Sequence, residues 1–238
     1  RMGQGVNEGK RNSRAGAIIV AAGASQRMHG VDKVLAPLAG KPLLAWTVEA
    51  FQLCNAIQHV VIVVNKQNLL PVKEMAAEQR WDKVAEVCPG GARRQDSVAR
   101  GLEKLKDCDW VVIHDGARPC VTPQLIELGL AEARKTGSAI AAVPVTDTIK
   151  TVGPDKLVTD TPQRSNLWSV QTPQIFRFDI IQAAYTKIQE DVTDDASLVE
   201  KMGFRVKAFM GAYENIKITN PQDLATAEWI LEKRKHGS

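Results

Sequence analysis

The sequence lacks the patterns that would indicate a zinc site, a disulfide framework or a membrane span. It has 238 residues and four cysteines, and no two of the cysteines form a Cys-x-x-Cys pair. No two of its four histidines stand four residues apart, as a helical zinc site requires. The longest uncharged, mostly apolar run, residues 15–24, is too short to cross a bilayer. We therefore expect a cytoplasmic protein with buried free thiols, no zinc and no membrane contact.

The sequence also carries little net positive charge outside its first 14 residues. The formal net charge is +4, and this opening segment holds four basic residues and one acidic residue, which leaves +1 for the rest of the chain. A nucleic-acid-binding protein carries more positive charge on its folded body, so we expect no nucleic-acid partner. Residues 1–14 show no apolar periodicity and are predicted to be a disordered tail or a remnant of a cloning sequence.

Short apolar runs alternate with segments of helical periodicity along most of the chain. Strands are predicted over residues 17–21, 59–64, 84–87, 110–114, 139–145, 204–209 and 215–219. Helices are predicted over residues 42–54, 69–79, 95–105, 123–134, 178–188 and 196–202, with a closing helix from Pro221. This alternation favours one doubly wound, Rossmann-like α/β domain over residues 15–238, with a mainly parallel sheet.

Residues 146–169 interrupt the alternation. The runs 148–152 and 157–161 flank a turn at residues 153–156, which predicts a β-hairpin. A two-stranded hairpin is not stable alone and must pack on something. It either forms an arm that grips a second subunit or packs back on its own domain, and both interpretations stay open.

Small residues follow the first predicted strand. Ala21, Ala22 and Gly23 let backbone N–H groups approach a phosphate, and Arg27 and Lys33 can neutralise its oxygens. This turn lacks the G-x-G-x-x-G and G-x-x-x-x-G-K patterns, so it favours neither a dinucleotide fold nor a P-loop. The alternative is that both cations are solvated loop charges.

Two further strands end in residues that suit a phosphorylated ligand. Asp115 follows strand 110–114 and could hold Mg²⁺, or it could cap a turn and pair with Arg118. In the loop of residues 89–97, the pair Gly90 and Gly91 permits flat approach to a base, and Ser97 could donate to it. The alternative for this loop is an N-capping turn. Ligands of open α/β sheets bind at the carboxyl ends of strands, where all these residues fall.

An ordered series of motifs resembles a known family, the 2-C-methyl-D-erythritol 4-phosphate cytidylyltransferases. The resemblance covers about residues 15 to 232 and is far more specific than any single motif. It is carried by Ala21-Ala22-Gly23, Arg27-Met28, Lys33, Gly90-Gly91, Arg94, Asp96-Ser97-Val98, His114-Asp115, Ala117-Arg118-Pro119, Asp147-Thr148-Ile149-Lys150, Arg164, Leu167-Trp168, Thr172-Pro173-Gln174, Thr193-Asp194-Asp195-Ala196-Ser197 and Asn215-Ile216-Lys217-Ile218-Thr219.

The resemblance implies a nucleotidyltransferase domain, a homodimer joined by the hairpin arm, and transfer of CMP from CTP to a sugar-alcohol phosphate with Mg²⁺ or another divalent cation. Catalytic roles would fall on Arg27, Lys33 and Lys217, and nucleotide binding on Ala21, Ala22, Gly23, Gly91 and Ser97. The alcohol phosphate would be bound by Asp115, Arg118, Thr148, Arg164, Thr172, Thr193 and Lys217, with Thr148 and Arg164 entering from the partner's arm. Asp115 would also bind the metal.

Two positions depart from the family pattern. Val20 stands where a proline is common, which removes only rigidity, and Ala92 stands where some relatives have an acidic residue. The second departure leaves any side-chain contact at that position in doubt.

Two rival functions stay open. A ribitol 5-phosphate cytidylyltransferase has the same fold and nucleotide chemistry. A non-catalytic nucleotide-binding protein would be expected to have lost Arg27, Lys33 or Asp115, and all three are present.

Overall fold

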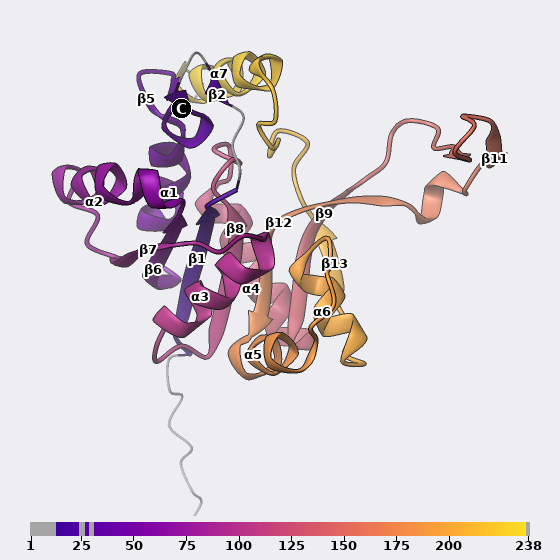
Figure 1. Ribbon diagram of the computed structural model, residues 1–238, viewed down its shortest axis with the longest axis horizontal. Coiled ribbons are helices and arrows are strands. Elements are labelled where there is room, and N and C mark those ends of the chain that lie inside the picture. The colour runs from indigo at the N-terminus through magenta and orange to yellow at the C-terminus, as the bar shows by residue number, and fades with distance from the viewer. Residues whose placement is uncertain (1–12, 24–26, 29–30, 237–238) are drawn as a thin grey trace, which may run out of the picture.

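The computed structural model describes residues 13–23, 27–28 and 31–236. Its centre is a seven-stranded sheet in the order β13-β9-β12-β8-β1-β6-β7 (Figure 1). The strands are β1 (Ala15–Ala21), β6 (Ile57–Val64), β7 (Val84–Pro89), β8 (Trp110–Asp115), β9 (Ser138–Pro144), β12 (Trp168–Arg177) and β13 (Lys207–Met210). The doubly wound, mainly parallel sheet predicted from the sequence is confirmed, whereas most of the predicted tail, residues 1–12, lies outside the described residues.

The described part of the chain has seven helices, of which the first six flank this sheet and the last packs in a separate apolar cluster: α1 (Leu43–Leu53), α2 (Leu69–Glu78), α3 (Arg94–Lys104), α4 (Pro123–Thr136), α5 (Phe178–Lys187), α6 (Asp195–Lys201) and α7 (Pro221–His236). Side chains alternate between the faces of β1, so Ile19 packs with α1, α2 and α4, while Ile18 packs with α3, α5 and α6. Both faces of the sheet are therefore covered, which is why its strands read as nearly continuous apolar runs.

β12 is the one strand of the sheet that the sequence analysis missed. It pairs antiparallel with both β8 and β9, and its register to β9 shifts between Val170 and Gln174. The polar residues Gln171 and Gln174 are nevertheless buried. Because a proline and buried polar groups interrupt the apolar pattern, no strand periodicity is visible there.

The strand predicted over residues 215–219 is wrong. These residues form an irregular segment with no strand partner. Ile218 is buried in a third apolar cluster with α7, and its backbone N–H donates to the carbonyl of Ala117. The alternating apolar residues of this segment therefore serve packing against a loop and a helix, without any ladder.

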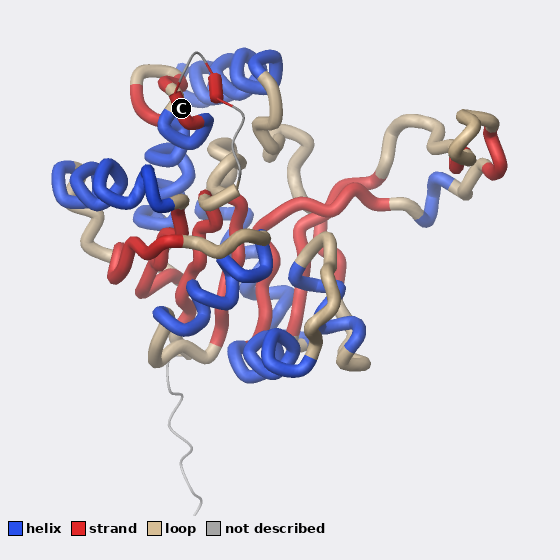
Figure 2. Tube along the Cα trace, viewed as in Figure 1, coloured by secondary structure: helices blue, strands red, loops and turns tan. Residues whose placement is uncertain are grey.

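The hairpin predicted around residues 153–156 is present, with shorter strands, β10 (Thr151–Val152) and β11 (Val158–Asp160). Figure 1 and Figure 2 show that it extends away from the sheet on two long connections. Its residues are almost all exposed.

Two further short ladders and three 3₁₀ turns complete the described fold. The ladders are β2 (Arg27–Met28) with β3 (Val31–Asp32) and β4 (Pro37–Leu38) with β5 (Lys41–Pro42), and the turns are η1 (Lys33–Leu35), η2 (Lys66–Asn68) and η3 (Arg164–Asn166). Among the described residues, no helix combines the length and apolar character that a bilayer crossing requires.

Candidate functional site

The carboxyl ends of β1, β7 and β8 meet at one edge of the sheet and line a pocket of about 260 Å³. Because the three strands are parallel neighbours or next neighbours, the loops that follow them converge there. The lining residues are Val20, Ala21, Ala22, Gly23, Lys33, Val34, Gly91, Ala92, Arg93, Arg94, Ser97, Asp115, Ala117 and Lys217. All five residues predicted to bind the nucleotide are thus in one pocket.

A second pocket of about 460 Å³ adjoins the first. Its lining includes Arg118, Thr172 and Thr193, together with Gln171, Gln174, Asp194 and Ser197. Arg94, Asp115 and Lys217 line both pockets. These three side chains therefore stand at the boundary between the two cavities.

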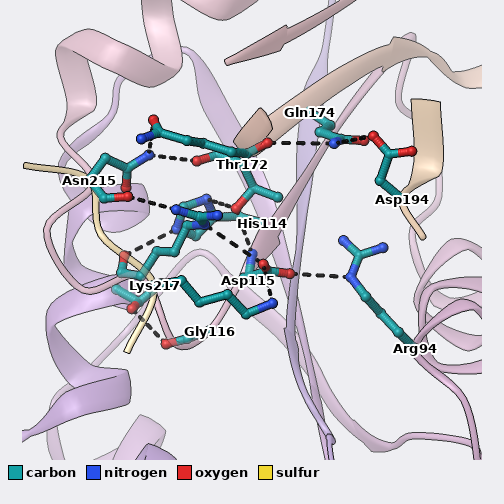
Figure 3. Close-up of polar contacts among 12 residues, drawn as sticks. Arg94, His114, Asp115, Gly116, Thr172, Gln174, Asp194, Asn215 and Lys217 are labelled. Carbon is teal, nitrogen blue, oxygen red and sulfur yellow. Dashed lines mark hydrogen bonds and ion pairs between the residues drawn. The ribbon is translucent and has the colours of Figure 1, made fainter. Parts of the chain in front are cut away.

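The carboxylate of Asp115 is the anion at this boundary, and cations from three chain segments surround it (Figure 3). Its Oδ1 is 3.2 Å from Nε of Arg94, and its Oδ2 is 3.0 Å from Nζ of Lys217 and 3.7 Å from Nε of Arg118. Burial opposes the charged form, but Arg94 and Lys217 outweigh it and hold the pKa of Asp115 well below its usual range. Asp115 is therefore ionised at neutral pH.

Lys33 enters the first pocket from the turn η1, close to Lys217. Burial and the neighbouring charge of Lys217 lower the pKa of Lys33. An anionic ligand placed between two such cations reverses this effect and favours the charged amines. This pair thus suits a polyphosphate.

Behind Asp115, the fully buried His114 organises the base of the site. Its Nε2 is 3.2 Å from the carbonyl oxygen of Arg118, which can only accept, so Nε2 carries the proton. Nδ1 is then an acceptor, and the hydroxyl of Thr172 donates to it at 3.0 Å (Figure 3). The same hydroxyl accepts from the backbone N–H of Asp115 at 3.0 Å. The hydroxyl proton of Thr172 is thus donated to His114, and the hydroxyl oxygen holds the backbone N–H at the end of β8.

The loop between β7 and α3 approaches the ends of β1 closely. A Cβ on Gly90 would lie 2.3 Å from Cβ of Ala22, and one on Gly91 would lie 2.3 Å from Cβ of Asp96. The N–H of Gly91 donates to Oγ of Ser97 at 3.1 Å. Only glycine fits at both positions, and the loop presents mostly backbone groups to the pocket.

The structure gathers most, but not all, of the predicted site residues. Lys33, Lys217, Asp115, Arg118, Thr172 and Thr193 line the two pockets with the nucleotide-loop residues. Thr148 and Arg164 lie on the exposed arm and line neither pocket of their own chain. The side chain of Arg27 lies outside the described part of the structure, although its backbone forms β2.

The sequence analysis assigned no role to Arg94, Asn215 or Asp195. Asn215 donates to the carbonyl of Thr172 at 2.7 Å, and its own carbonyl accepts from Arg118. Asp195 is fully buried and forms an ion pair with Arg94. These partners are far apart in the chain, so no local pattern could have revealed them.

The donor set for a metal is small. Within the described residues, no three histidine, cysteine, aspartate or glutamate side chains cluster as a metal site would require. Asp115 alone offers a carboxylate to both pockets. This arrangement fits Mg²⁺, which commonly takes one or two protein carboxylates and completes its shell with water and substrate phosphates.

An open, mostly parallel sheet with two cationic pockets sharing one edge is the arrangement of α/β proteins that bind phosphorylated ligands at the carboxyl ends of strands. The family model for IspD, 2-C-methyl-D-erythritol 4-phosphate cytidylyltransferase, matches residues 15–233. The chain therefore belongs to this family, and the resemblance stated above is confirmed.

Individual relatives agree with this assignment. A 2-C-methyl-D-erythritol 4-phosphate cytidylyltransferase of Dehalococcoides mccartyi is 53% identical over 222 residues, which cover 93% of this chain and 98% of the relative. The crystal structure of a 4-diphosphocytidyl-2C-methyl-D-erythritol synthase from Anaerococcus prevotii has a TM-score of 0.83 at 29% identity, covering 93% and 99% of the two chains. A cytidylyltransferase structure from Thermus thermophilus, with a TM-score of 0.75 at 30% identity, covers 90% and 98%.

The neutral state of His114 predicts a pH dependence of stability. Burial lowers the pKa of His114 to about 4, from an ordinary value of 6.5. Between these values the unfolded chain binds a proton that the folded chain does not, so stability falls as the pH drops from about 6.5 towards 4. The contribution is about 1.4 kcal/mol per pH unit in this window and none above it.

Urea unfolding of the unmodified protein and of His114→Gln at a series of pH values measures this effect. The difference in slope between the two proteins should appear only within the window. Equal slopes would show that His114 does not titrate between the folded and unfolded states as its surroundings require.

Proposed function

We propose that the two adjoining pockets bind CTP and 2-C-methyl-D-erythritol 4-phosphate and transfer CMP from the first to the second. The products are 4-diphosphocytidyl-2-C-methyl-D-erythritol and pyrophosphate, as expected of this isoprenoid-pathway family. The observation that carries this proposal is that Asp115 and Lys217 line both pockets. Two phosphorylated substrates seated there meet at the same pair of side chains.

The first pocket suits CTP. Its walls at Ala21, Ala22, Gly23 and Gly91 expose backbone groups, and Ser97 is the hydroxyl nearest the glycine loop. Ala92 offers no polar side chain, so discrimination of cytosine from uracil falls to backbone groups and Ser97. A mismatched base would leave buried groups unpaired at about 1 to 3 kcal/mol each.

The second pocket suits the alcohol phosphate. Arg118 supplies a fixed positive charge, and Thr193 supplies a hydroxyl to the lining of the same pocket. Arg118 is held at 2.7 Å to the carbonyl of Asn215, so its guanidinium is oriented before a ligand arrives. Thr172 contributes to this pocket chiefly by accepting the backbone N–H of Asp115.

The chemistry is an in-line displacement at the α-phosphorus of CTP. An oxygen of the acceptor phosphate forms the new P–O bond, and the bond from the α-phosphorus to the bridging oxygen of pyrophosphate breaks. A phosphate monoester is already an anion near pH 7, so no general base is required. Lys33 and Lys217, with Arg27 from β2, stabilise the charge that develops on the phosphoryl oxygens.

Mg²⁺ is the proposed cofactor, and Asp115 is its proposed protein ligand; other divalent cations would fill the same role. When bound, the ion would neutralise phosphate charge and help to orient the triphosphate. A cytoplasmic location is part of the proposal, supported by four cysteines that are free of disulfide bonds.

A homodimer is proposed because Thr148 and Arg164 line neither of the two described pockets of their own chain. The arm that carries them exposes apolar side chains, among them Val152, Leu157 and Val158 at 52%, 66% and 57%. Exposed apolar groups on a hairpin that extends away from the described body of its own chain are typical of an intersubunit contact. In the dimer, each arm would bring Arg164 to the partner's second pocket.

The activity is tested by pyrophosphate release from CTP with methylerythritol phosphate or ribitol 5-phosphate as acceptor. We expect turnover with the first acceptor, preference for CTP over UTP by about 10²-fold in kcat/KM, and loss of activity on chelation. Lys33→Ala should lower kcat by about 10²- to 10³-fold with little change in Tm. Lys66→Ala, an exposed lysine outside both pockets, is the matched control.

Preference for ribitol 5-phosphate would reassign the substrate, and equal use of UTP would contradict the cytosine pocket. Activity unaffected by chelation would contradict the metal. A wild-type kcat in Lys33→Ala would remove that residue from the catalytic set, and no turnover with either acceptor would favour a non-catalytic nucleotide-binding protein.

The shared site predicts that two inactive variants restore one another. When Lys33→Ala and Arg164→Ala chains are refolded together, a heterodimer has one site with an intact Lys33 and an intact partner Arg164. Random pairing should return about one quarter of the unmodified activity, because half of the dimers are mixed and one of their two sites is complete. Each variant refolded alone is the control. Mixed dimers observed by native mass spectrometry without any recovered activity would contradict the hypothesis that the two subunits share a site.

A further inference from the structure

Arg94 is a charged residue at the pocket boundary for which the proposed reaction has no role. It lies in the first turn of α3 and lines both cavities, as Asp115 and Lys217 do. Its neighbour Arg93 lines only the first pocket and pairs with the solvent-accessible carboxylates of Asp96 and Asp191. The two adjacent arginines therefore differ in surroundings, and only Arg94 contacts the carboxylate of the site.

The guanidinium of Arg94 joins two carboxylates from different elements. Its Nε donates to Oδ1 of Asp115 at 3.2 Å, at the end of β8, and its Nη2 is 2.8 Å from Oδ2 of Asp195, in the first turn of α6 (Figure 3 shows the Asp115 contact). Burial opposes the charge, but Asp195 and Asp115 together raise the pKa of Arg94. A planar fork can hold two carboxylates in fixed directions, which a lysine ammonium cannot do.

Asp195 is anchored more firmly than a surface partner would be. Its side chain is 0% exposed, and its Oδ1 accepts the hydroxyl of Tyr185 from α5. The start of α6 is fixed in turn by Gln174 of β12, which donates to Asp194 at 2.9 Å and accepts from the N–H of Ala196 at 3.1 Å. Hydrogen bonds from α5 and β12 therefore hold Asp195 and the start of α6 in place.

A buried carboxylate is costly unless it is paired, and apolar residues would stabilise such a position at least as well. Stability alone therefore does not explain an ion pair here. The Arg94 guanidinium of this pair also contacts Oδ1 of Asp115, whereas Oδ2 of Asp115 faces Lys217 and Arg118. Without Arg94, Oδ1 of Asp115 loses the contact that fixes the rotation of the carboxylate, and Lys217 and Arg118 hold only Oδ2.

We propose that Arg94 is a positioning residue for the transfer reaction, and that Asp195 acts through it by fixing the guanidinium against Asp115. This inference rests on the proposed function. It assigns a purpose to the buried Tyr185–Asp195–Arg94 contacts: they set the direction of the Asp115 carboxylate at the boundary where both substrates meet.

Two substitutions and their combination test the inference. Arg94→Lys keeps the charge and removes the fork, and Asp195→Asn keeps the volume and the acceptor for Tyr185 while removing the charge. Each should lower kcat by about 10- to 100-fold, with KM for CTP changed far less, because misplacement of reacting groups affects the transition state most. The double variant should be no slower than Arg94→Lys, since Asp195 has no effect except through Arg94.

Matched controls separate this role from general destabilisation. Arg177→Lys alters an arginine paired with Asp179 at an exposed site outside both pockets, and Ile181→Val trims a fully buried residue of α5 near Tyr185. Both should leave kcat unchanged, and Ile181→Val should lower Tm. All proteins are assayed below the lowest midpoint measured by circular dichroism.

The outcomes distinguish the two levels of the proposal. An active unmodified protein whose Arg94→Lys and Asp195→Asn variants keep a normal kcat contradicts only the inference. Losses that multiply in the double variant also overturn it, because the residues would then act independently. Failure of both single variants to fold would make the pair structural and equally overturn it. An inactive unmodified protein contradicts the proposed function itself.

Discussion

The site depends on one buried anion, the carboxylate of Asp115, and on the cations that make its burial possible. Arg94 comes from α3, Arg118 from the turn after β8, and Lys217 from the segment before α7. A lone carboxylate in this position would be strongly destabilising, so the three cations and the anion specify one another's places. Elements that are distant in sequence are thereby drawn to the same edge of the sheet.

The same arrangement prepares the site for anionic ligands. Burial and the nearby charge of Lys217 disfavour the charged form of Lys33 and lower its pKa. Phosphate oxygens remove this penalty, whereas His114 stays neutral and contributes only hydrogen bonds. Arg94, Arg118 and Lys217 are thus gathered around Asp115 without a ligand having to organise them.

Much of the fold could be predicted from the sequence because both faces of the sheet are buried. β1 is apolar throughout, β6 is apolar from Val60 to Val64 and β8 from Trp110 to Ile113, and the helices between them have clear apolar periodicity. β12 escaped prediction because Gln171, Thr172 and Gln174 are buried for their hydrogen bonds. Residues 215–219 were wrongly predicted as a strand, because Ile216 and Ile218 alternate with polar residues as in a strand. In the structure these isoleucines pack under α7.

The candidate site, like the fold, could be predicted from the sequence only in part. Lys33, Asp115 and Ser97 could be found because each follows a recognisable strand and belongs to a motif that resembles the family. Arg94 and Asp195 could not be paired from sequence, since 100 residues separate them and a buried ion pair leaves no periodic trace. The engagement of the Thr172 hydroxyl by His114 is likewise a property of the folded arrangement.

A crystal structure with CTP and methylerythritol phosphate bound would test most directly the claim that Asp115 stands at the meeting point of two substrates. We expect the cytosine beside Gly91 and Ser97, the acceptor phosphate beside Arg118, and Asp115 between the acceptor and the triphosphate, still held by Arg94. Either ligand bound away from these pockets, or an acceptor phosphate out of reach of the α-phosphorus with Asp115 turned aside, would contradict the claim.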